Sequence, residues 1–217
     1  MRMIQIKKST LLIIFLLTIA LASFKALAVN SGLASSERDV INFEKAVSNN
    51  DYLKAWKIGN EFLKQGPINK SYLTLLDAYW SGSLPGFRDA EDQEALLLMI
   101  ASYVVQGVSN RQINRDITSY LKFSEKAVKS KYPQNVSRAI LILAYSGKNE
   151  YVPIFERNLH SVDRIVSDGA TIALALSCSV TASEWARYTN KIKNEKRKAY
   201  ANKVWMQSQG MRQNCDS

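Results

Sequence analysis

The sequence predicts an all-α fold, and three observations support this prediction. Apolar residues recur at helical spacing along most of the chain. Only four prolines and nine glycines interrupt the 217 residues, and runs of Val, Ile and Thr that favour strands are scarce. A hydrophobic content of 47% and a charged content of 22% are ordinary for a globular protein with a sizeable core. We expect about nine helices with short breaks, stacked as αα-hairpins in a helical solenoid or an irregular bundle.

Residues 1–28 have the features of a secretory signal peptide. A positive start that includes Arg2 precedes an apolar run at residues 11–22, and residues 26–28 read Ala-Leu-Ala, a pattern that signal peptidases cleave. An uncleaved membrane anchor is the alternative, but a helix over this run spans only about 18 Å, short of a hydrocarbon core of about 30 Å. We therefore expect export to the periplasm, or secretion if the source is not a Gram-negative bacterium. Residues 29–217 then form a single mature domain.

The first half of the mature domain is expected to form five helices. The spacing of Val40, Phe43 and Val47 indicates the first helix, and a Gly-Pro pair ends the second. The third helix leads into a long loop. After the loop, residues 95–105 are apolar nearly all round, which indicates a central buried helix. An amphipathic helix follows at residues 113–130.

The longest irregular connection is expected at residues 81–90, which read SGSLPGFRDA. The candidate protein-binding residues are Phe87 and Arg88 in this connection and Trp80 just before it. Several acids begin the next helix, namely Asp89, Glu91, Asp92 and Glu94. Glycoside hydrolysis needs only two carboxyl groups, so these acids are the one arrangement suited to catalysis. The positive end of a helix also favours acids, so a structural role is the competing interpretation.

The segment at residues 133–178 reads as three helices with short breaks and carries an internal echo at a spacing of 31. The pairs that coincide under this shift are Ala139 with Ala170, Leu141 with Ile172, Leu143 with Leu174, and Ala144 with Ala175. In this pattern the segment resembles a HEAT-like repeat, with a helix of small and leucine positions, a polar turn and a second helix. The resemblance implies stacked helix pairs with a concave face that binds proteins or peptides. An irregular helical bundle is the alternative.

A single long helix is expected at residues 181–209, with a basic run in its middle. The basic residues are Lys191, Lys193, Lys196, Arg197 and Lys198. One interpretation is the solvated middle of a helix docked at both ends, and the other is a patch for an acidic partner or lipid headgroups. Removal of the signal takes four basic residues from a formal net charge of +10 and leaves +6. This mild charge suits acidic protein surfaces or anionic lipid and does not argue for nucleic acid.

Cys178 and Cys215 are the only two cysteines. An even number of cysteines in an exported chain predicts a disulfide. That bond would join the tail of the chain to the end of the HEAT-like segment, and two free thiols are the alternative. The chain has no Cys-x-x-Cys pattern, which argues against a redox-active pair.

His160 is the only histidine, so a serine or cysteine triad would have to use it. A zinc site needs several His or Cys ligands, and no phosphate loop or dinucleotide fingerprint is present. We therefore expect no cofactor, no metal and no catalysis. The leading hypothesis is an exported helical protein that binds another protein, in one version an immunity protein that neutralises a toxic effector in the periplasm. The alternatives are a peptidoglycan-hydrolysing enzyme that uses the paired carboxylates, and a peripheral membrane-surface protein that uses the basic run.

Overall fold

A computed structural model describes residues 33–49, 51, 54–55, 57–59, 61, 70–82 and 90–209. The helices in these ranges are α2 (Leu33–Ser48), α4 (Lys70–Trp80), α5 (Ala90–Ser109), α6 (Thr118–Ala127), α7 (Pro133–Tyr145), α8 (Val152–Leu159), α9 (Arg164–Leu176), α10 (Ala182–Asn190) and α11 (Glu195–Ser208), with a 3₁₀ turn, η1 (Asn149–Tyr151). No strand occurs in the described ranges, so the predicted all-α class is confirmed.

The predicted signal peptide at residues 1–28 lies outside the described residues, and it stays a prediction. The same holds for residues 83–89, which include Phe87, Arg88 and Asp89, and for Cys215. Within the ranges that the structure describes, no helix combines the length and the apolar composition needed to cross a bilayer.

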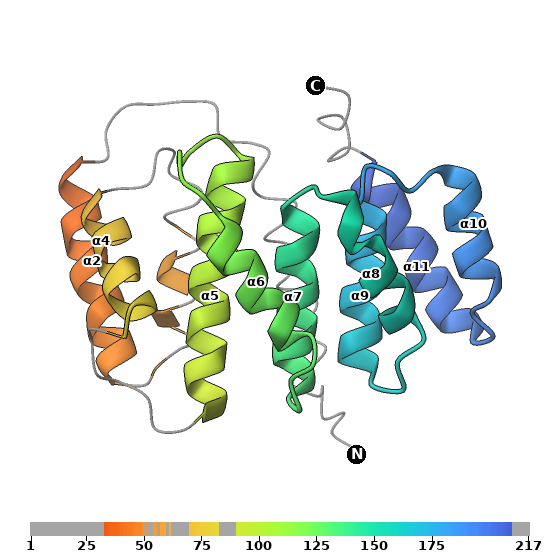
Figure 1. The fold of residues 1–217 in the computed structure, drawn as a ribbon, viewed down its shortest axis with the longest axis horizontal. Coiled ribbons are helices and arrows are strands. Elements are labelled where there is room, and N and C mark those ends of the chain that lie inside the picture. The colour runs from red at the N-terminus through yellow and green to blue at the C-terminus, as the bar shows by residue number, and fades with distance from the viewer. Residues whose placement is uncertain are drawn as a thin grey trace, which may run out of the picture.

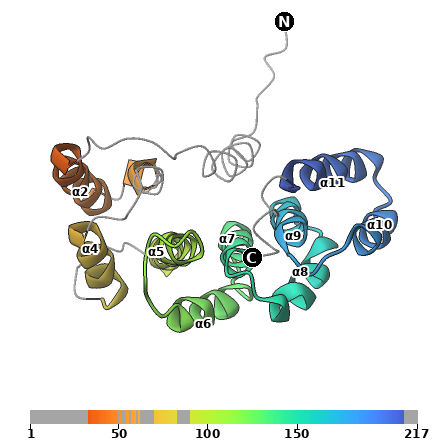
Figure 2. The ribbon, with the colours of Figure 1, turned by 90° about the horizontal axis from the view of Figure 1, so that it is seen from above.

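From α5 onward, successive helices alternate between two rows. Helices α5, α7, α9 and α11 contact one another in sequence, and α6 packs on α5 and α7 while α8 packs on α9. Figure 2 shows α6 and α8 along one side of this row, and Figure 1 places α2 and α4 at one end of the molecule and α10 and α11 at the other. The C-terminal helices therefore form one end of the part of the molecule that the structure describes.

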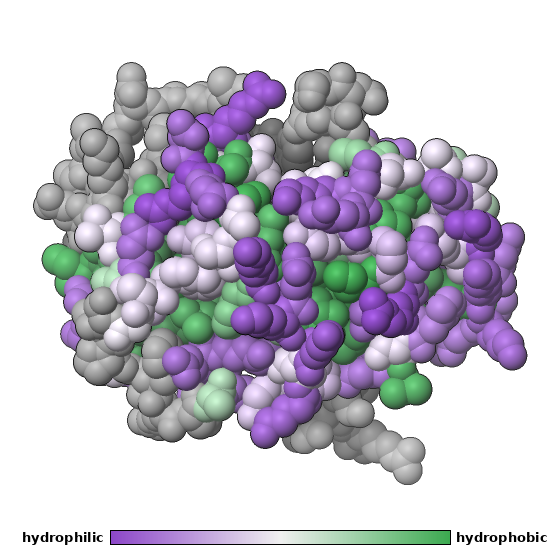
Figure 3. All heavy atoms as spheres, viewed as in Figure 1, coloured by the Kyte–Doolittle hydropathy of each residue, from purple (hydrophilic) through white to green (hydrophobic). Residues whose placement is uncertain are grey.

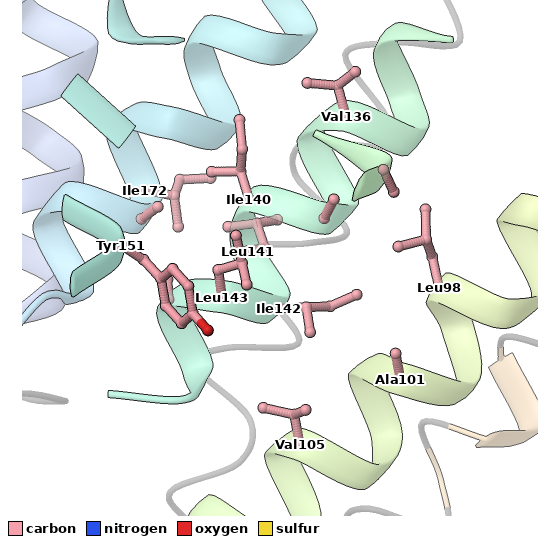
Figure 4. Packing of buried hydrophobic residues seen from close by; sticks show 14 of the residues in the cluster. Leu98, Ala101, Val105, Val136, Ile140, Leu141, Ile142, Leu143, Tyr151 and Ile172 are labelled. Atoms are coloured by element: carbon pink, nitrogen blue, oxygen red, sulfur yellow. The ribbon is translucent and has the colours of Figure 1, made fainter. Parts of the chain in front are cut away.

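Helix α7 lies at the centre of the core. Its Ile140, Leu143 and neighbouring apolar residues are buried, and Figure 4 shows them between Leu98 and Val105 of α5 on one side and Ile172 of α9 on the other. Helices α7 and α9 pack so closely that a Cβ built on Gly169 would lie 2.3 Å from Ser137 Oγ. The two helices also begin and end 31 residues apart, at Pro133 and Arg164 and at Tyr145 and Leu176. The echo in the sequence therefore corresponds to two adjacent helices of equal length.

Local signals explain where these helices begin and end. Pro133 occupies the first turn of α7, where its missing N–H costs nothing. Gly147 follows α7 with a φ of 69°, a left-handed conformation that suits glycine at a helix end. Asp163 caps the start of α9, since its Oδ1 accepts hydrogen bonds from the backbone N–H of Ile165 at 2.8 Å and of Val166 at 3.3 Å.

The single long helix expected at residues 181–209 is wrong, because the chain forms α10 and α11 with a break at residues 191–194. Within this break the side chain of Ile192 is buried in the core, at 8% exposure. Asn194 then starts the next helix, since its side chain accepts a hydrogen bond at 3.1 Å from the backbone N–H of Arg197. The basic run therefore covers the non-helical residues 191–194 and the first helical turn of α11, and it does not lie in the middle of a helix.

Candidate functional site

A pocket of about 320 Å³ lies between α8 and α10. Its lining residues are Pro153, Glu156, Arg157, Leu159, His160, Tyr188 and Lys191. Leu159 and Tyr188 are 2% and 5% exposed and give the pocket a buried, largely apolar floor. Arg157, His160 and Lys191 are exposed and give it a polar rim.

One hydrogen bond at the floor of this pocket joins the two helices. The Tyr188 hydroxyl on α10 donates to Glu156 Oε1 on α8. Burial of Tyr188 and its hydrogen bond to the Glu156 carboxylate raise the pKa of the phenol, so the hydroxyl stays protonated and remains a donor. The guanidinium of Arg187 lies 5.3 Å from the centroid of the Tyr188 ring, a cation–π distance. The hydrogen bond from the Tyr188 hydroxyl holds the Glu156 carboxylate in place and occupies one of its oxygens.

Two of the basic residues predicted from the sequence lie at the end of α8 that borders this pocket. Lys191 lines it, and Lys193 and Lys196 are exposed nearby in the chain. Arg197 is half-buried, and its Nη2 donates to the carbonyl oxygen of Leu159 at 3.1 Å, which places the start of α11 against the end of α8. Arg197 therefore has a structural role, since it satisfies a carbonyl that the end of α8 leaves without a helical partner. Lys198 is also half-buried.

Carboxylates at this end of the molecule are largely used in internal bonds. Asp163 caps α9, Glu156 accepts from Tyr188, and Glu184 completes a capping box with Thr181 at the start of α10. Asp168 is buried at 3% exposure and its Oδ2 lies 3.3 Å from Nε of Arg164. These four acids are therefore poorly placed to neutralise the nearby lysines, whereas Glu195, in the first turn of α11, is exposed beside them in the chain.

We define the C-terminal basic surface as Arg157, Lys191, Lys193, Lys196 and Lys198. None of the five forms an ion pair with any residue that the structure describes. Figure 3 shows hydrophilic side chains gathered over the end of the molecule where α10 lies. Positive charges that lack internal partners project a field that attracts anionic groups.

Trp80 does not stand free at the end of α4. Its ring is half-buried and packs on α6, with centroids 4.4 Å from Tyr120 and 5.4 Å from Phe123. This contact joins α4 to α6 and gives Trp80 a structural role. Its predicted partners in binding, Phe87 and Arg88, lie outside the described residues.

The acids expected at the start of α5 are partly engaged in structure. Glu94 Oε2 accepts hydrogen bonds from Asn135 Nδ2 at 2.8 Å and from Ser130 Oγ at 2.6 Å. Asn135 is 1% exposed, so these bonds satisfy a buried amide at the start of α7. Glu91 and Asp92 lie in the first turn of α5, where the helix dipole favours them.

His160 is exposed at the end of α8, on the rim of the pocket, and Cys178 is exposed just after α9. His160 and Lys191 both line the pocket, although no pattern in the sequence connects them. Glu156 and Tyr188 were missed altogether, because they are 32 positions apart on different helices. Among the residues that the structure describes, no group of three or more His, Cys, Asp or Glu is placed to hold a metal ion.

Comparison of the chain with protein-family models, curated proteins and solved structures found no match. The function is therefore argued from the residues of the chain, and above all from the charge and shape of the α8–α10 end.

Proposed function

We propose that this chain is an exported, non-catalytic protein that binds another protein through the C-terminal basic surface. The observation that supports the proposal is the set of five cations that form no ion pair with any described residue, beside several acids that are used in internal bonds. A partner with an acidic face complements this surface, because opposite potentials speed association and disfavour partners of like charge.

A narrower version makes the partner a toxic effector and this chain its periplasmic immunity protein. The basic surface suits that role, since an inhibitor that recognises an acidic active-site cleft needs exposed cations on a rigid support. Here α8, α10 and α11 supply the support, tied together by the Tyr188–Glu156 and Arg197–Leu159 hydrogen bonds. A toxin gene next to the gene for this chain is the expected genetic context.

Charge reversal tests the proposal. The partner is isolated from the native periplasm with the mature wild-type protein, and its association with purified variants is then measured by surface plasmon resonance. The test variant combines Lys193→Glu, Lys196→Glu and Lys198→Glu, which lie outside the pocket. Its association rate is expected to fall at least about tenfold, and the wild-type rate to fall with rising salt.

The matched control carries the same change of charge on another face. It combines Lys122→Glu, Lys126→Glu and Lys129→Glu, three exposed lysines on α6 and just after it. This control is expected to bind within about twofold of wild type, because α6 packs on α5 and α7, whereas the tested lysines lie on α11 and just before it. Equal loss in both variants, or repeated isolation without any partner, would refute the proposal.

A further inference from the structure

We infer that the pocket between α8 and α10 binds a carboxylate, supplied by an acidic side chain or a C-terminus of a peptide segment. The inference rests on the proposed function, in which a partner protein supplies that segment. It adds a specific contact point to a surface that otherwise acts through its general charge.

The size of the pocket suits a single residue. A volume of about 320 Å³ lies at the lower end of the range for ligand pockets. Its floor combines Leu159 with the ring of Tyr188, which is suited to the methylene groups of a side chain. A ligand that fits this space places an apolar stem on the floor and a charged group at the rim.

The rim is suited to an anion. Arg157 and Lys191 are pure hydrogen-bond donors, and neither forms an ion pair within the described ranges. His160 adds a third group that can donate from the end of α8. A guanidinium and an ammonium that line the same pocket can each donate to an oxygen of a carboxylate, and charge-assisted bonds of this kind are the strong ones.

The one acid in the lining selects between anions. Glu156 offsets one of the two fixed positive charges, so the pocket keeps a single excess charge when His160 is neutral. This balance suits a singly charged carboxylate better than a doubly charged phosphate. The Tyr188 hydroxyl holds the Glu156 carboxylate at the floor, so this acid does not compete with the ligand for the cations of the rim.

His160 provides a local reporter because it is the only histidine in the chain. The mature protein is titrated with two short peptides while the ring C–H resonances of His160 are followed by NMR. One peptide has Glu side chains and blocked ends, and the other has a free C-terminal Leu and no acidic side chain. Inorganic phosphate and phosphatidylglycerol vesicles are the comparison probes.

We expect saturable shifts of the His160 resonances with at least one peptide at millimolar concentrations, and the responding peptide identifies the source of the carboxylate. Arg157→Gln and Lys191→Gln are each expected to weaken this binding about tenfold. Glu156→Gln is expected to strengthen it, because the amide oxygen still accepts from Tyr188 while the repulsion is removed. The control Lys203→Gln removes an exposed charge of α11 outside the pocket lining and is expected to change nothing.

Several results would overturn the inference. They are the absence of a saturable shift with either peptide, binding that Arg157→Gln and Lys191→Gln leave unchanged, and a response to phosphate or vesicles alone. The triple variant Lys193→Glu, Lys196→Glu and Lys198→Glu changes only residues outside the pocket, so it tests the proposed function separately. If that variant still binds the partner while the peptide titration succeeds, the proposed surface is wrong and the pocket stands.

Discussion

Substituting Gly169 by Ala tests the close packing of α7 against α9. A Cβ at this position would lie 2.3 Å from Ser137 Oγ, 3.2 Å from its Cβ and 3.3 Å from its Cα. Rotation of the Ser137 hydroxyl relieves the shortest of these contacts. The other two involve the Cβ and backbone of α7, so one helix has to move by a few tenths of an ångström. Both residues are buried, and the row of helices on either side resists that movement.

Two opposing terms set the size of the effect. Ala is favoured over Gly inside a helix by about 1 kcal/mol. Overpacking of a well-filled core costs about 1–3 kcal/mol. We therefore expect Gly169→Ala to lower the free energy of unfolding by about 1 kcal/mol. For a domain of this size that change lowers Tm by about 3 °C.

The assay is urea and thermal unfolding followed by circular dichroism, in wild type and in a Ser137→Gly background. Removing the Ser137 side chain leaves only its Cα near the new methyl group, so Gly169→Ala is expected to cost less, or to stabilise, in that background. Ala199→Gly, at an exposed position inside α11, measures the helix-propensity term by itself. Equal effects of Gly169→Ala in the two backgrounds, or a gain of about 1 kcal/mol in wild type, would refute the reasoning.

Two further predictions concern Asp168 and Cys178. Burial raises the pKa of Asp168 above its ordinary value, although Arg164 and Arg197 oppose the shift. The folded state therefore holds this proton more tightly, and wild type is expected to lose stability relative to Asp168→Asn as pH rises from about 4 through the raised pKa. Thermal melts of both proteins across that range check this, and a difference in Tm that does not vary with pH contradicts it. Cys178→Ser is expected to cost about 4 kcal/mol, because the predicted disulfide to Cys215 no longer restricts the unfolded chain. Intact mass with and without reductant and urea unfolding test it, and equal stability of the variant and the oxidised wild type counts against the bond.

Local sequence signals predicted much of the helical framework. The apolar run at residues 95–105 covers most of the buried part of α5, and Pro133 and Gly147 mark the two ends of α7. These features act through neighbouring residues in the chain, so they are readable without knowledge of the fold. The spacing of 31 also corresponds to a physical relation, because it separates the two adjacent helices α7 and α9. The HEAT-like resemblance itself stays a prediction.

The break between α10 and α11 was not predicted because no proline or glycine marks it. Residues 191–194 read Lys-Ile-Lys-Asn, and each of these is tolerated inside a helix. The break depends on Ile192 reaching the core and on Asn194 capping the next helix. The first of these is a tertiary effect that overrides local propensity. The pocket was missed for a related reason, since its Tyr188–Glu156 bond joins two helices that local patterns treat separately.

The unexpected break also places Lys191 and Arg197 at the same end of α8. In a continuous helix, Arg197 would lie about 9 Å beyond Lys191 along the axis of α10, since each residue adds about 1.5 Å. Instead the chain turns, and Arg197 reaches the Leu159 carbonyl while Lys191 lines the pocket formed by the same end of α8. Both ends of the basic run therefore lie against one helix terminus. A run that reads in the sequence as a solvated helical stretch therefore contributes, through four non-helical residues, one cation to the pocket rim and one anchor to the end of α8.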